Sequence, residues 1–131
     1  MKLATLFTVG AILAIGFAVP LLLVPGEFLA MYAVESTPGA VLLARLLGAA
    51  FTAIGVLSWL ARALPEESAG ARVVVRALLV GNSIGFVVTL ASRLQGVGNA
   101  LVWSSVVIYA LFAGAYGMFA MRKPRTDAAT A

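Results

Sequence analysis

Residues 3–26 decide the fold: they read LATLFTVGAILAIGFAVPLLLVPG, 24 residues without a charged side chain. At about 1.5 Å of rise per residue, a helix of this length crosses the ~30 Å hydrocarbon layer of a membrane. Met1-Lys2 in front of it could open a signal peptide, but the apolar stretch is longer than the typical hydrophobic region of a signal peptide and no A-x-A-like cleavage site follows. We therefore predict a retained transmembrane helix over about residues 3–24.

Three further apolar segments follow along the chain. They predict spans over about residues 38–64, 73–94 and 100–121, with Thr37 and Asn99 as N-caps of the second and the fourth. The connections between the later spans are short, so neighbouring helices must be antiparallel. The sequence thus predicts an all-α fold, a four-transmembrane-helix up-down-up-down bundle over residues 1–121, followed by a polar tail over residues 122–131.

The composition excludes several functional classes. Apolar residues make up 63% of the chain and charged residues 11%, whereas about a quarter of a soluble domain is charged. The chain contains no Cys and no His, which excludes thiol chemistry, a Ser–His–Asp triad and the usual Zn, Cu and Fe sites. None of the five acidic residues lies inside an apolar run, which disfavours a proton relay. We predict no metal, no cofactor and no enzymatic activity.

The basic residues predict the orientation, because Lys and Arg accumulate in cytoplasmic loops. Seven lie on one side of the predicted membrane and only Arg93 lies at the other; the seven are Lys2, Arg62, Arg72, Arg76, Arg122, Lys123 and Arg125. Both termini are therefore predicted to be cytoplasmic, in a multi-pass protein of the bacterial cytoplasmic (inner) membrane. The net charge of +4 comes from these flanking residues and does not indicate nucleic-acid binding.

Small residues recur along the later spans. The third span carries the GxxxG pair Gly81 and Gly85, and the other two carry stripes: Ala44, Gly48, Thr52 and Gly55 in the second, and Ala110, Ala113, Gly114 and Gly117 in the fourth. Membrane helices associate through close packing of such residues. The stripes predict contacts between helices of one chain or, as the alternative, a face for a homo-oligomer or a larger membrane complex.

Arg45 lies about two turns, or ~10 Å, into the second span. An arginine at the centre of a membrane helix costs about 2.5–3.5 kcal/mol even on insertion scales, so this side chain needs partners. Glu27 and Glu35, in the preceding outer loop, are the candidate ion-pair partners. Such a pair would tie the outer loop to the bundle.

A functional alternative is an outward-facing pocket around Arg45. Asn82, Thr89 and Arg93 are spaced i, i+7 and i+11, so they share one face of the third span. Arg45 and Arg93 would meet an anionic or amphipathic molecule there, and Asn82, Asn99 and Tyr109 would offer hydrogen bonds deeper in the membrane.

The outer loop itself carries a helical pattern. Phe28, Met31 and Tyr32 recur at i, i+3 and i+4, which indicates a short helix in the membrane interface. It would act either as a lid or simply as an interfacial loop.

The first half of the chain resembles an uncharacterised family of small four-helix bacterial membrane proteins. The residues that carry the resemblance are VPGEFLAMYAV (24–34), ARLLGA (44–49), Gly55 and WLAR (59–62), within about residues 20–62. At position 33, where the family pattern implies Gly, this chain has Ala. The resemblance implies the four-span fold and singles out Arg45, but it implies no activity. Small multidrug transporters and dual-topology fluoride channels resemble the chain in size alone.

Three functions follow from these observations. The first is a non-catalytic accessory or structural subunit of a membrane complex. The second is a membrane binding or transport protein that uses the pocket around Arg45. The third is a lipid-modifying enzyme, which is disfavoured because no general base lies in the membrane. Membrane lipids are partners in each case.

Overall fold

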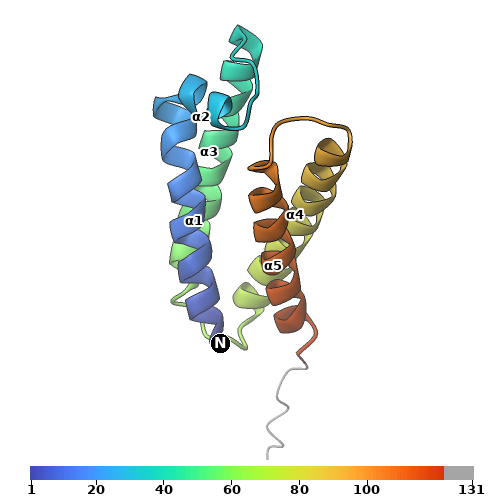
Figure 1. The fold of residues 1–131 in the computed structure, drawn as a ribbon. Helices are drawn as coiled ribbons and strands as arrows, with labels where there is room; N and C mark the ends of the chain where they lie inside the picture. Colours follow the sequence, from blue (N-terminus) through green and yellow to red (C-terminus); the bar gives the residue numbers. More distant parts are fainter. Residues whose placement is uncertain (123–131) are drawn as a thin grey trace, which may run out of the picture.

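The structure is a computed structural model that describes residues 1–122, and in this range it is all-α (Figure 1). Its helices are α1 (Leu3–Leu23), α2 (Pro25–Met31), α3 (Pro38–Ala61), α4 (Ala69–Leu94) and α5 (Val102–Ala120). All but α2 are long and apolar enough to cross a membrane, so the chain is a multi-pass membrane protein. Of the predicted polar tail, residues 123–131 lie outside the described range.

Local hydrogen bonds set where the helices begin. The Thr37 hydroxyl accepts a bond from the Ala40 amide at 3.2 Å, which confirms the predicted N-cap of α3. The Ser68 hydroxyl accepts one from Ala71 at 3.1 Å, so α4 begins four residues before the predicted position 73. At α5 the prediction was wrong, because the helix begins at Val102 with Leu101 as its N-cap.

The helices form two antiparallel hairpins, α1 with α3 and α4 with α5 (Figure 1). In the first hairpin, small residues let the two backbones approach closely. A Cβ on Gly48 would come 2.8 Å from Leu22, and one on Gly55 would come 2.7 Å from Ile15. The small residues of α3 therefore pack within the chain, as one of the two alternatives predicts.

The second hairpin has a similar contact at Gly85. The ring of Tyr109 packs against this glycine, so that a Cβ there would come 2.6 and 2.8 Å from the ring atoms Cδ1 and Cζ. Gly85, one glycine of the predicted GxxxG pair, thus packs against a helix of the same chain. The other, Gly81, has nothing within 4 Å of its Cβ position.

The two hairpins meet in a hydrophobic core at one end. The core consists of Leu3, Leu6, Phe7, Ala61, Ala71, Val75, Leu78, Tyr116 and Phe119. The rings of Phe7 and Tyr116, from different hairpins, lie 6.1 Å apart. On α4, burial stops at Leu78, so the rest of that helix contributes no buried residue. The bundle is therefore closed at this end rather than uniformly compact.

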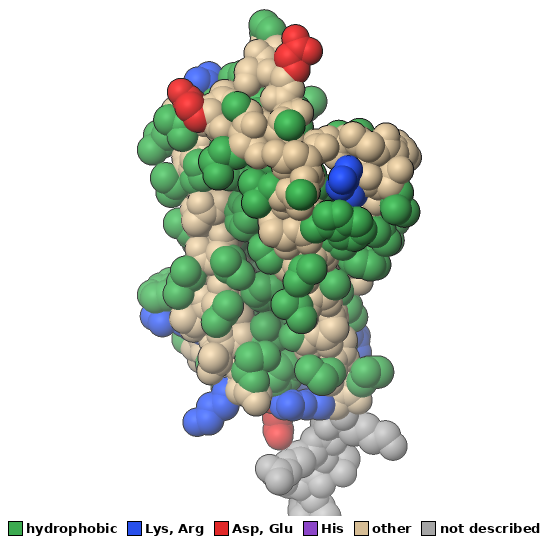
Figure 2. All heavy atoms as spheres, in the orientation of Figure 1, with side chains coloured by type: hydrophobic (Ala, Val, Ile, Leu, Met, Phe, Trp, Pro, Cys, Tyr) green, Lys and Arg blue, Asp and Glu red, His purple; other side chains and the backbone are tan. Residues whose placement is uncertain are grey.

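Charge distinguishes the two ends of the molecule. The core end, which we call the basic end, carries Lys2, Arg62, Arg72, Arg76 and Arg122. The loop end is the opposite one, formed by α2 and the turn at residues 95–99. Figure 2 shows basic side chains gathered at the lower end and apolar side chains covering the middle. This is the surface expected of a protein whose middle faces lipid.

Candidate functional site

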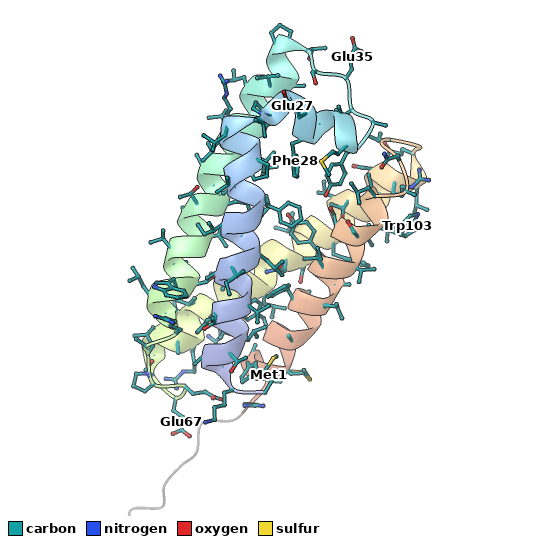
Figure 3. All side chains as sticks on the ribbon, turned by 60° about the vertical axis from the view of Figure 1, so that its left-hand side comes forward. Met1, Glu27, Phe28, Glu35, Glu67 and Trp103 are labelled. Atoms are coloured by element: carbon teal, nitrogen blue, oxygen red, sulfur yellow. The ribbon has the colours of Figure 1, made fainter. Side chains whose placement is uncertain are left out.

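The helix α2 lies across the loop end and holds the two hairpins together there. Phe28 points from α2 into the molecule (Figure 3), where its ring meets that of Phe17 edge-on at 6.1 Å. The Tyr32 ring lies 5.3 Å from Phe28, and Phe51 of α3 lies 6.0 Å from Phe17. The i, i+3, i+4 pattern therefore predicted this short helix correctly, because its aromatic face packs on the first hairpin.

The C-terminus of α2 is closed by backbone hydrogen bonds. Val34 donates to the Leu29 carbonyl and Ala33 to the Ala30 carbonyl, each at 3.0 Å, which together form a Schellman motif. Ala33 takes the left-handed position of this motif, with φ of 55°. Glycine normally occupies that position, because it adopts a positive φ without the steric cost of a Cβ.

Asn99 ties the second hairpin to the end of α2. Its backbone amide donates to the Tyr32 carbonyl at 3.1 Å, and its Nδ2 donates to the Met31 carbonyl at 2.8 Å. Its Oδ1 accepts from the Leu101 amide at 2.9 Å, which turns the chain into α5. Asn99 thus satisfies two carbonyls that α2 leaves free at its C-terminus.

The turn before Asn99 can approach α2 only because it contains glycine. Gly98 has φ of +71°, and a Cβ there would come 3.0 Å from the Tyr32 carbonyl oxygen. The sequence predicted a short connection here but not this contact. No local signal could show it, because the two partners are far apart in the chain and meet only in the folded hairpins.

The predicted polar face of α4 exists, but two of its members are bonded to their own helix. Asn82 Nδ2 donates to the Leu78 carbonyl at 2.7 Å, and the Thr89 hydroxyl donates to the Gly85 carbonyl at 2.8 Å. Such bonds to the preceding turn satisfy polar side chains without a ligand. Tyr109 belongs to the same region through its contact with Gly85.

Arg93 is the member of this face that is not fully satisfied. It is half-buried, and its Nε is shielded from solvent without a hydrogen-bond partner among the described residues. Asn82, Thr89 and Arg93 share one face of α4 by their spacing, Tyr109 contacts this helix at Gly85, and Asn99 bonds to the end of α2 instead.

The predicted ion pair of Arg45 with Glu27 or Glu35 is not formed in the described part of the chain. All three side chains are exposed, and the salt bridge found there joins Arg122 to Glu66 at 2.6 Å. The reason lies in the packing of α3, whose buried face contains Ala44 and Gly48. Arg45 is turned by about 100° from Ala44, which places it off the packed face.

Two surface hollows stand out in the described residues, and neither is lined by the predicted polar cluster. One is an apolar groove of about 600 Å³ between the start of α1 and α5, lined by Met1, Leu6, Ala110, Leu111, Phe112, Gly114, Ala115 and Met118. The other, of about 490 Å³, lies at the basic end and is lined by Ala4, Thr5, Thr8, Arg62 and Ala63. The outward-facing pocket predicted around Arg45 is neither of these.

No family model, curated protein or solved structure matches the chain. The resemblance of residues 20–62 to small four-helix bacterial proteins therefore stays a prediction. The apolar groove along α5 is the surface feature of the right size and character for a partner.

Proposed function

We propose that this chain is a non-catalytic accessory or structural subunit of a complex in the bacterial cytoplasmic membrane, and that it works by packing against another transmembrane helix. That helix belongs either to a second copy of the chain or to a different protein. The proposal is supported by the apolar groove along α5, which small residues keep open.

The groove differs from the packed glycine contacts elsewhere in the chain. At Gly48, Gly55 and Gly85, a Cβ would meet side chains of the same chain within 3 Å. At Gly114, which lines the groove, a Cβ would meet nothing within 4 Å. Close approach of helix backbones through small residues is the main source of helix association in lipid. Gly114 therefore offers a contact that the chain itself does not use.

Arg45 is consistent with the same role. It is exposed on α3 and makes no hydrogen bond or ion pair within residues 1–122. An arginine near the end of a transmembrane helix reaches either the headgroups or a polar group of a neighbouring protein. A complex would supply the second kind of partner.

Single-cysteine crosslinking tests the proposal directly, because the natural chain contains no Cys. A Gly114→Cys variant, oxidised or treated with a short bifunctional reagent in its own membrane, should give a covalent adduct. An adduct of twice the chain mass means a homo-oligomer, and another mass means a different subunit.

The control is Gly16→Cys on α1, because Gly16 also has nothing within 4 Å but does not line the groove. It should give far less adduct than Gly114→Cys. If the two variants crosslink equally, or if neither does, the groove is not a helix-docking site and the proposal fails.

A further inference from the structure

The second hollow, at the basic end, has the residues of an anion site. It lies where the beginning of α1 meets the end of α3, and it is lined by Thr5 and Thr8 from α1 and by Arg62, which follows α3. It is a shallow, open hollow of about 490 Å³. No acidic residue lines it.

Arg62 is held in place by an aromatic ring. Its guanidinium carbon lies 3.4 Å from the centroid of the Trp59 ring, which is a cation–π contact. Stacking uses the flat face of the guanidinium and leaves its N–H edges available. These edges have no hydrogen-bond acceptor among the described residues. A planar guanidinium with a free edge matches a phosphate group.

The two threonines add complementary groups on the same face of α1. The Thr8 hydroxyl donates to the Ala4 carbonyl at 2.8 Å, so its oxygen remains available as an acceptor. The Thr5 hydroxyl makes no side-chain hydrogen bond in the described residues, so it can donate. The face then becomes apolar, because Ile12 continues it and is 62% exposed.

The charge around the hollow favours an anion. Among the described residues, the basic end carries five basic side chains, Lys2, Arg62, Arg72, Arg76 and Arg122, against Glu66 and Glu67. Glu66 is already paired with Arg122. A juxtamembrane Lys or Arg contributes about 1 kcal/mol to the attraction of anionic lipid. A tryptophan at the headgroup level is also typical of a lipid-contacting boundary.

We propose that this hollow binds the phosphodiester headgroup of an anionic phospholipid. Arg62 and Thr5 donate hydrogen bonds to the phosphate oxygens, and Thr8 accepts one from a headgroup hydroxyl. The acyl chain runs along the α1 face at Ile12. The order of groups, first charged, then hydroxyl, then apolar, is the order within a phospholipid.

Native mass spectrometry of the full chain from nanodiscs tests this site. The nanodiscs contain phosphatidylglycerol and phosphatidylcholine in equal amounts, and the ratio of the two lipids that stay bound is measured. Arg62→Gln should lower the retention of phosphatidylglycerol at least fivefold. Thr5→Val should lower it by a smaller factor. Arg62→Lys keeps the positive charge for membrane orientation but loses the planar edge, so it should give an intermediate loss.

The matched control is Arg76→Gln, which removes the same charge at the same end but does not line the hollow. It should change retention less than twofold. Equal losses from Arg62→Gln and Arg76→Gln would mean diffuse attraction to the membrane surface and would overturn the site. Inorganic phosphate is added as a competitor: displacement of the lipid at millimolar phosphate would show a site for free phosphate and overturn the lipid assignment.

Discussion

Replacing Ala33 with glycine should stabilise the end of α2. Ala33 has φ of 55° in the Schellman motif, and the left-handed conformation costs an L-residue about 1–2 kcal/mol. Glycine adopts it without this cost but loses about 0.5–1 kcal/mol more backbone entropy on folding. Because Ala33 is exposed, its methyl group contributes little packing. The net expectation for Ala33→Gly is a gain of about 0.5–1 kcal/mol.

Amide hydrogen exchange measures this gain where it arises. The Val34 amide, bonded to the Leu29 carbonyl at 3.0 Å, should exchange about two to five times more slowly in the variant. Ala30→Gly is the matched control, because Ala30 is an exposed residue inside α2. There glycine should cost about 1 kcal/mol and speed up exchange of the same amide. Faster exchange in both variants would refute the left-handed conformation at position 33.

Three further predictions concern other contacts. Gly85→Ala should destabilise the protein by about 1–3 kcal/mol in thermal unfolding in detergent, because the added Cβ would meet the Tyr109 ring. Gly81→Ala should not destabilise it, because a Cβ at Gly81 meets nothing within 4 Å. Equal effects of the two variants would contradict this packing. Asn99→Ala should cost about 1 kcal/mol of stability and speed up amide exchange over residues 31–34. Asn99→Asp keeps the acceptor for the Leu101 amide but loses the bond to Met31, so it should speed up the same exchange. Unchanged exchange in both variants would show that Asn99 does not hold α2 to the second hairpin. A reporter fused after Ala131 should be active only in the cytoplasm, since seven of the basic residues flank that side, and activity outside would reverse the orientation.

The four long helices could be predicted because the physics that defines them is local. An apolar run of sufficient length must satisfy its backbone within a helix when its surroundings are lipid. The ends were harder to place. The third span was predicted to begin at residue 73, directly after Arg72, whereas α4 begins at Ala69 after the Ser68 cap and includes Arg72 as well as Arg76. A helix does not end where the hydrocarbon ends, since long basic side chains reach the headgroups from within it.

The position of Arg45 was predictable from a pattern already visible in the sequence. The stripe of Ala44, Gly48 and Gly55 defines one face of α3, and the structure buries that face against α1. The residue that directly follows Ala44 must then lie about 100° away. The expectation of a buried, paired arginine considered depth along the helix but not rotation about its axis.

The role of Asn99 was not predictable in the same way. An Asn before an apolar run indicates an N-cap, and its Oδ1 does accept a local amide. Its bonds to Met31 and Tyr32 depend on how α2 lies across the loop end. That placement follows from aromatic packing between Phe28 and Phe17, which no spacing rule within one segment contains.

The glycine of α5 that borders the apolar groove is the strongest support for the proposed role. Glycine inside a helix is about 1 kcal/mol less favourable than alanine, and close packing is the usual compensation in a membrane. Gly48, Gly55 and Gly85 have that compensation within the chain, because each sits against a side chain of a neighbouring helix. Gly114 borders the apolar groove on α5, and a Cβ there would meet nothing within 4 Å; Gly16 and Gly81 are equally open but do not line the groove. A helix from outside the chain is the contact that would offset its cost, which is why the groove, rather than the polar residues near Arg45, defines the proposed role.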